Sequence, residues 1–265
     1  MQETDHISFS EPLEQFAPVT LDEMDSVKLM NRIDTKYLTS ESVLMEILKD
    51  AAADGYRALE TDGLKINPYD SLYYDTDSLK MFQDHHNRRL VRQKVRTRSY
   101  LTSGLAFLEI KRKNNKGRTK KKRISIPMSD FDDFRNNTQA ADYLAAHSAY
   151  TKDQVSPVLE TLFNRITLVN RAMTERLTID TSLVFRNHRT GVEASLKDAV
   201  IIELKQDGRA DSEMKNILLD HRVKPIRVSK YCIAVTLTDP DARCGRFRTK
   251  VRRIEKTINK KITVI

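Results

Sequence analysis

The sequence predicts an α+β fold, an antiparallel β-barrel that surrounds a polar, basic lumen and carries helices on its outside. Three observations lead to this prediction. Several segments alternate apolar and charged residues at every second position, as strands with two different faces do. Amphipathic segments with helical spacing stand before and after these strands. The positive charge is gathered in one part of the chain.

The net charge of +9 is unevenly distributed along the 265 residues. Residues 88–123 hold fifteen lysines and arginines against one acid, Glu109, which gives this window a charge of +14 and leaves −5 for the other 229 residues. A hydrophobic content of 39% is enough for a buried core. We expect a single domain over residues 1–265, with an acidic segment at 1–26 and a basic helix at 246–265.

The composition excludes several kinds of site. None of the seven glycines has the G-x-G spacing of dinucleotide-binding or Walker A loops, so any phosphate would be bound by side chains. The longest apolar run has five residues, 231–235, whereas a membrane span needs about 20. Cys232 and Cys244 lack zinc-site spacing, and the acidic N-terminus is unlike a signal peptide. The expected location is cytoplasmic, with no membrane segment.

The first third of the chain mixes both kinds of element. Residues 1–26 favour a loop or weak helix, and 31–38 an extended segment. A capping sequence at 39–41 opens an amphipathic helix that reaches about residue 53. Residues 56–59 and 72–75 are typical of strands, and 78–86 of a short helix.

Period-two alternation then dominates the basic segment. In 90–100 one strand face carries Arg92, Lys94, Arg96 and Arg98. In 105–113, Glu109, Lys111 and Lys113 share a face opposite to an apolar one. The strand 118–126 follows a turn at 114–117, so the two strands are predicted to form a long hairpin.

The second half continues the pattern after a helical insertion at 128–150. Strands are expected at 161–170, 174–185 and 199–205. In the second of these, one apolar face is predicted to hold Leu177, Ile179, Leu183 and Phe185. Helices are expected at 211–221, 229–237 and 246–261.

The charged strand faces indicate an anion. A solvated face of an ordinary antiparallel sheet is one explanation of the alternation. However, neighbouring like charges repel unless an anion or an acid lies opposite, and a barrel closed around a basic lumen would supply such a site. Arg and Lys bind phosphate oxygens, and carboxylates among them suit Mg²⁺ or Mn²⁺. The residues therefore predict a di- or polyphosphate ligand with a divalent metal.

An ordered series of short motifs covers about residues 32–235. The segments, in chain order, are Arg32-Ile33-Asp34-Thr35-Lys36-Tyr37, Tyr73-Tyr74-Asp75-Thr76, Arg96-Thr97-Arg98 with Tyr100, Glu109-Ile110-Lys111, Phe163-Asn164-Arg165, Glu175-Arg176-Leu177-Thr178-Ile179-Asp180, Glu203-Leu204-Lys205 and Ser229-Lys230-Tyr231. In order and strand phase this set resembles the VTC-type polyphosphate polymerase domain of the triphosphate tunnel metalloenzyme superfamily.

The resemblance implies an antiparallel tunnel and an enzyme, an ATP–polyphosphate phosphotransferase. It would transfer the γ-phosphate of ATP to inorganic polyphosphate, with pyrophosphate-like chains as primers. Glu203 would hold Mn²⁺ or Mg²⁺, and Glu109 is a second candidate ligand. The residues implied to bind phosphate are Lys36, Arg96, Arg98, Lys111, Arg165, Arg176, Lys205 and Lys230.

Two other functions stay open at this point. The first strand lacks the E-x-E-x-K motif of the superfamily's hydrolases, which places a tripolyphosphatase or nucleoside triphosphatase second. A non-enzymatic polyanion- or RNA-binding module is third. Only Tyr100 and Phe107 interleave the basic residues, so no nucleic-acid partner is expected. No oligomeric state is predicted.

Several residues also have plainer interpretations. Lys120-Lys121-Lys122-Arg123 is typical of a surface run, although Arg123 could reach the tunnel mouth. His85 and His86 favour an exposed turn. Glu203 and Lys205 could pair across strands, Glu109 could hold Lys111, and Tyr231 favours packing over chemistry.

Overall fold

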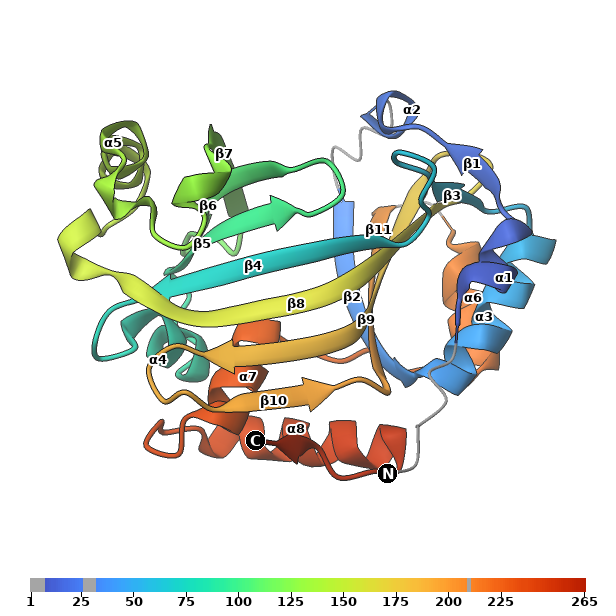
Figure 1. Cartoon of the computed structure of the whole chain (residues 1–265). Helices are drawn as coiled ribbons and strands as arrows, with labels where there is room; N and C mark the ends of the chain where they lie inside the picture. The colour runs from blue at the N-terminus through green and yellow to red at the C-terminus, as the bar shows by residue number, and fades with distance from the viewer. Residues whose placement is uncertain (1–7, 26–31, 209–210) are drawn as a thin grey trace.

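The computed structural model describes residues 8–25, 32–208 and 211–265, and its strands form one twelve-stranded sheet (Figure 1). The main path runs β12-β10-β9-β8-β4-β5-β6-β7, and β11 pairs with both β9 and β2. All pairings are antiparallel except that of β1 with β3. The α+β fold with an antiparallel sheet is confirmed. The strands are β1 Ala17–Val19, β2 Arg32–Ser40, β3 Arg57–Leu59, β4 Asn67–Asp75, β5 Arg92–Tyr100, β6 Leu105–Lys113, β7 Thr119–Ile126, β8 Ser156–Val169, β9 Glu175–Asn187, β10 Glu193–Leu196, β11 Ala199–Asp207 and β12 Thr263–Val264.

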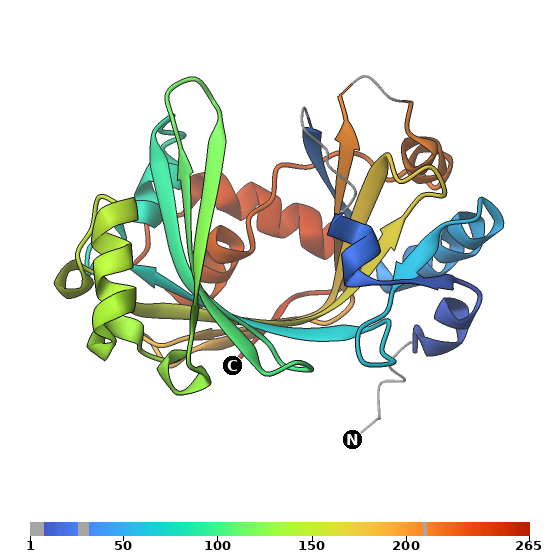
Figure 2. The same ribbon diagram turned by 90° about the horizontal axis from the view of Figure 1, so that it is seen from above.

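The sheet curves into a tunnel but hydrogen bonds do not close it, which corrects the expected closed barrel. Among the described residues, β2 pairs only with β11 and β7 only with β6, so these two strands are edges. Figure 2 shows the two arms, with the β6–β7 hairpin on one side and β2 with β11 on the other. Lys111 on β6 is nevertheless near enough to Glu203 on β11 and Lys36 on β2 for their charges to influence its pKa.

Side-chain alternation gives the sheet a charged concave face and an apolar convex face. On neighbouring strands Lys36 lies opposite Glu203, and Arg96 lies opposite Glu109. The intervening residues, such as Ile202 and Ile110, are buried in apolar clusters on the other side. The predicted hairpin of 105–113 with 118–126 is confirmed, since β6 pairs with β7 along its length.

Helices cover the convex face at both ends. α1 Ser10–Glu14, α3 Glu41–Ala53 and α6 Glu213–Asp220 pack with β2, β8, β9 and β11 in one cluster. Ser40 caps α3 by accepting a hydrogen bond from the Val43 amide. α5 Thr138–His147 packs on β4, β5 and β6, after two short 3₁₀ helices, Met128–Asp130 and Phe134–Asn136. The helical insertion at 128–150 is thereby confirmed.

Two C-terminal helices depart from the prediction that helices lie only outside. α7 Lys230–Thr238 shares an apolar cluster with Leu38, Tyr73, Phe163 and Ile201, which have the same strand phase as the lumen charges. α7 therefore packs against the concave side, together with α8 Gly245–Ile258, and Figure 2 shows both red helices between the two arms. α4 Lys80–His86 joins the same cluster through Phe82.

The single apolar face predicted for 174–185 is wrong. Ser182 has a positive φ of 52°, and the register of β8 against β9 shifts between Leu162 and Asn164. This β-bulge changes which face later side chains occupy. As a result Leu177 and Ile179 pack with α3 and α6, whereas Leu183 and Phe185 pack with α7.

Several boundaries also differ. The segment expected to be a loop or weak helix contains α1, β1 and α2 Leu21–Asp25, while residues 1–7 lie outside the described part. The basic C-terminal helix ends at Ile258, because Asn259 adopts the left-handed conformation and the chain continues into β12. In the described part of the chain, no helix is both long and apolar enough to cross a membrane.

Candidate active site

The concave face defines a lumen that gathers basic side chains from seven strands and from the start of α7. The carboxylates of Glu109, Asp180 and Glu203 form ion pairs with some of these bases. The described lumen cations are Lys36, Lys94, Arg96, Arg98, Lys111, Lys121, Arg123, Arg165, Arg176, Lys205 and Lys230.

Glu203 on β11 lies between two lysines. Its Oε1 is 3.0 Å from Lys36 Nζ, and its Oε2 is 3.9 Å from Lys205 Nζ. Burial would raise the pKa of Glu203, but Lys36 and Lys205 hold it well below its ordinary range. Burial in turn lowers the pKa of Lys205 to about 8, against the opposing effect of Glu203. Glu203 and Lys205 lie on the same strand, so their contact runs along β11, and the cross-strand partner of Glu203 is Lys36.

Asp180 on β9 joins a strand arginine to the helix. Arg165 donates to both carboxylate oxygens, at 2.7 and 2.9 Å, and Lys230 Nζ lies 2.6 Å from Oδ2. The same ammonium lies 3.0 Å from the centroid of the Phe163 ring. These contacts fix Lys230, the first residue of α7, inside the lumen.

Glu109 on β6 is 2% exposed and holds different partners from the one predicted. Arg96 donates to its Oε2 from Nε at 2.8 Å and from Nη2 at 2.5 Å, and Lys121 pairs with Oε1. Glu109 therefore anchors Arg96 and Lys121 rather than Lys111. Arg96 also donates to the Tyr73 hydroxyl at 3.0 Å.

Four lumen cations have no ion-pair partner among the described residues: Lys94, Arg98, Lys111 and Arg123. Arg98 is 7% exposed, donates to Ser71 Oγ at 2.9 Å and lies over the rings of Tyr69 and Phe163. Burial, and then the charge of Arg96, lowers the pKa of Arg98 to about 10. Lys94 donates to Ser229 Oγ at 2.9 Å. Burial also lowers the pKa values of Lys94 and Lys111.

Buried positive charges without counter-charges are costly unless an anion accompanies them. Lumen cations without a carboxylate partner lie on β5, β6 and β7. Other lumen cations are paired with carboxylates, and phosphate groups could replace these carboxylates as their partners. Arginine forks and lysine ammonium groups suit phosphate oxygens. The arrangement therefore fits a ligand with several phosphate groups in a row.

The structure brings together all the phosphate-binding residues predicted from the sequence. Arg176 lies on β9 directly opposite Lys205 of β11, at one end of the group. Four further charged residues of the lumen were not among the predicted site residues: Lys94, Lys121, Arg123 and Asp180. Lys94 has the same strand phase as Arg96, and Asp180 is the last residue of the motif at 175–180. The sequence could therefore have indicated that both residues belong to the site. Lys121 stands in a run of consecutive basic residues, so the sequence does not show which strand face it occupies.

Two plainer interpretations also need correction. Lys121 and Arg123 are part of the lumen wall, where Arg123 lies 4.6 Å from the Phe107 ring centroid, whereas Lys120 and Lys122 have the opposite strand phase. His85 and His86 do not form an exposed turn, because they lie on α4 and contact Phe247 of α8. Tyr231 is buried and packs on Tyr73, as expected.

The carboxylates suit a metal that binds together with phosphate. Within the described residues, no three acidic, histidine or cysteine side chains lie close enough to form a metal cage. Mg²⁺ commonly takes one or two carboxylates and completes its shell with phosphate oxygens and water. Glu203, whose side chain is 20% exposed, fits that role better than Glu109, whose oxygens face Arg96 and Lys121.

A comparison of the sequence with known protein families shows which family the chain belongs to. The sequence matches the VTC domain over residues 31–238. The chain belongs to the VTC domain family. This confirms the resemblance drawn from the motifs.

Solved structures similar to this VTC domain include two proteins named for adenylate cyclase. One, from Bacillus halodurans, has 11% identity and a TM-score of 0.49, covering 76% of this chain and 96% of its own. The other, from Hippeastrum, is described as having a dominant triphosphatase activity and has 13% identity and a TM-score of 0.49, covering 77% and 95%. No curated protein sequence matches.

Proposed function

We propose that this VTC domain is a polyphosphate polymerase, which transfers the γ-phosphate of ATP to a growing inorganic polyphosphate chain. The observation that carries the proposal is a set of lumen cations without counter-charges: Arg98, which is buried, Lys94, which is half-buried, and Lys111, which is exposed on the lumen wall. A ligand with several negative charges would neutralise these residues. Both the triphosphate of ATP and the polyphosphate chain carry such charges.

The lumen residues would position ATP and the polyphosphate chain and would neutralise the negative charge of their phosphate groups. Phosphoryl transfer has a loose transition state whose charge lies on the phosphate oxygens, so fixed cations lower its energy without a covalent intermediate. Arg96 and Arg165 are held by Glu109 and Asp180 in fixed orientations, which favours in-line alignment of donor and acceptor. Mn²⁺ or Mg²⁺ would bind Glu203 and phosphate oxygens and would neutralise developing charge.

The lumen supports transfer over hydrolysis as the main reaction. Hydrolysis requires an activated water, commonly bound to a metal with several protein ligands. Here the opening strand carries Lys36 where it faces Glu203, and Glu109, Asp180 and Glu203 of the lumen are each paired with bases. A tripolyphosphatase on the same fold remains the second candidate.

The deciding experiment incubates the full chain with ATP, a short polyphosphate primer and Mn²⁺ or Mg²⁺, and resolves chain length on a gel. Polymers longer than the primer are expected, and chelation of the metal with EDTA should stop their growth. Release of free phosphate without longer chains would identify a hydrolase instead.

Two variants test the assignment of the site. Arg98→Ala and Glu203→Gln should each reduce synthesis by at least about 100-fold, as loss of a group that stabilises transition-state charge does. Arg171→Ala, at an exposed position in the β8–β9 turn, is the matched control and should retain full activity. Wild-type rates in a folded Arg98→Ala protein would disprove the role of this arginine.

A further inference from the structure

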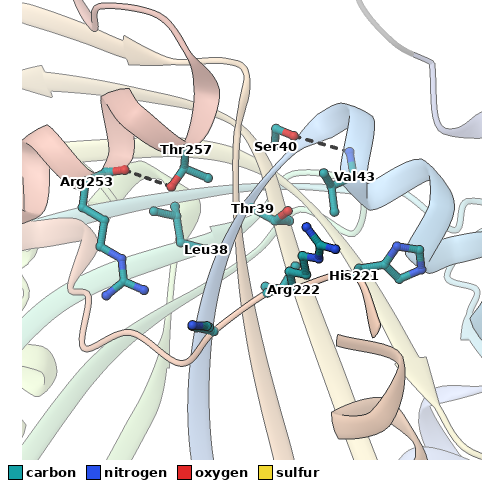
Figure 3. Close-up of a pocket in the computed structure, with 10 residues that line it drawn as sticks. Leu38, Thr39, Ser40, Val43, His221, Arg222, Arg253 and Thr257 are labelled. Carbon is teal, nitrogen blue, oxygen red and sulfur yellow. Dashed lines mark hydrogen bonds between the residues drawn. The ribbon is translucent and has the colours of Figure 1, made fainter. Parts of the chain in front are cut away.

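A second basic site lies outside the lumen, beside β2. A cavity of about 250 Å³ is bounded by the end of β2, the loop between α6 and α7, and one face of α8 (Figure 3). The loop runs along the outer edge of β2, where the Ile226 amide donates to the Lys36 carbonyl and Pro225 bridges to Tyr37. We call it the edge cavity. Its polar lining is Thr39, Ser40, Arg222, Lys224, Arg253 and Thr257, with His221 at one side.

The edge cavity carries uncompensated positive charge. Arg222, Lys224 and Arg253 are exposed and form no ion pair with any residue the structure describes. His221 is already paired with Asp50 at 2.7 Å. α8 holds six lysines and arginines, Arg253 among them, against Glu255, which itself pairs with Lys261 at 3.2 Å. The three basic residues of the edge cavity therefore have no carboxylate partner in the part of the chain that the structure describes.

The backbone conformation at the end of α6 places basic residues at the edge cavity. Arg222 stands at the end of α6 with a φ of 57°, in the left-handed conformation that glycine usually adopts there. The Arg222 and Val223 amides cap the helix by donating to the carbonyls of Leu219 and Leu218. The turn directs the chain so that both Arg222 and Lys224 line the cavity.

The lining favours phosphate groups over other anionic ligands. The volume is below the range of about 300–1,000 Å³ usual for drug-sized molecules. No Phe, Tyr or Trp lines the cavity, so it offers no platform for stacking nucleic-acid bases. α8 exposes no large apolar side chain, which argues against insertion into a membrane surface. Hydroxyls and basic groups together suit phosphate oxygens.

The edge cavity is close to the lumen along the chain. Lys36 of the lumen and Thr39 of the cavity are three residues apart on β2, a distance of roughly 10 Å in a strand. We propose that the edge cavity binds phosphate groups of inorganic polyphosphate outside the tunnel. This inference rests on the proposed function, because it takes the product of the tunnel as its ligand.

The test measures binding of long-chain polyphosphate and of tripolyphosphate to the full chain. Lys224→Glu/Arg253→Glu alters the edge cavity, Lys152→Glu/Arg171→Glu makes the same charge change at exposed positions elsewhere, and Arg98→Ala disables the tunnel. The cavity variant should bind long polyphosphate about tenfold more weakly, since charge-assisted hydrogen bonds are lost. Its affinity for tripolyphosphate should not change.

Equal affinity of the cavity variant and its control for long polyphosphate would overturn the proposal. So would an equal loss of tripolyphosphate binding, which would place these residues in the tunnel. In the Arg98→Ala background, the cavity substitutions should still weaken binding of long polyphosphate, and this result stands even if the wild type synthesises no polymer. If they instead weaken binding of RNA or of anionic lipid vesicles more than that of polyphosphate, the proposed ligand is wrong.

Discussion

Lys205 is a lumen residue whose charge depends on pH near neutrality. Burial lowers its pKa from an ordinary 10.5 to about 8, and Lys121 on the opposite arm also has a pKa of about 8. Above that pH the folded protein loses positive charge that the unfolded chain keeps until about pH 10. Between the two pKa values the unfolded state binds more protons, so the stability of the empty protein should rise with pH.

Binding of phosphate should have the opposite pH dependence. Affinity for tripolyphosphate should fall as pH rises through and beyond 8, by about tenfold for the loss of one charge-assisted hydrogen bond. Lys205→Arg should weaken this dependence, because arginine stays charged. Calorimetric titration of both proteins between about pH 7 and pH 9 measures the difference. Parallel curves for the two proteins would show that Lys205 is not responsible.

Residue-scale prediction from the sequence succeeded where alternation was clean. Arg96 and Arg98 share a strand phase with few interruptions, so their shared face could be predicted, and the structure places both on the lumen. Lys121 could not be distinguished from Lys120 and Lys122, because four consecutive basic residues fit either phase. The partner of Glu109 was also beyond prediction, since the register of β5 against β6 decides it.

At the scale of elements, α7 depends on one buried hydrogen-bond network. Asp75, at the end of β4, accepts from the Tyr231 hydroxyl at 2.6 Å and from the amides of Met81 and Phe82 in α4. Burial raises the pKa of Asp75, although these donors act in the opposite direction. Asp75 thus joins β4, α4 and α7, and it fixes the helix whose first residue, Lys230, enters the lumen.

Tyr231→Phe should therefore weaken both the fold and the site. It leaves a fully buried carboxylate with one donor fewer, which should lower the free energy of unfolding by about 1–3 kcal/mol. Because α7 is then less well fixed, tripolyphosphate should bind more weakly. Denaturant unfolding and calorimetry measure the two effects.

Tyr143→Phe is the matched control for that experiment. Tyr143 lies on α5 and contacts His147 through its ring. Its change should alter the free energy of unfolding by less than about 0.5 kcal/mol, as is usual for such positions. An equally small effect of Tyr231→Phe would contradict the role of the network.

At the scale of the whole molecule, the lumen is a concentration of like charge that the fold brings together. Such repulsion lowers the stability of the empty protein, and a bound polyanion should relieve it. Tripolyphosphate at about 100 times its Kd should stabilise the protein by about 2.7 kcal/mol, seen as a rise in Tm.

The double variant Arg98→Met/Lys111→Met tests this balance. Met keeps apolar contact with Tyr69 and Phe163 but removes two unpaired charges. The empty variant should have a higher Tm than the wild type, and tripolyphosphate should raise that Tm far less. A variant that is less stable when empty and equally stabilised by the ligand would refute the explanation.

The sequence by itself determined the fold class, the charged strand faces and the family, because period-two alternation and motif order are local properties of the chain. It did not determine the bulge at Ser182, the position of α7 on the concave side, or the open edges at β2 and β7. These depend on register and packing between segments far apart in sequence. Only the tertiary structure decided which cations have carboxylate partners, since a one-residue shift in strand pairing would exchange them.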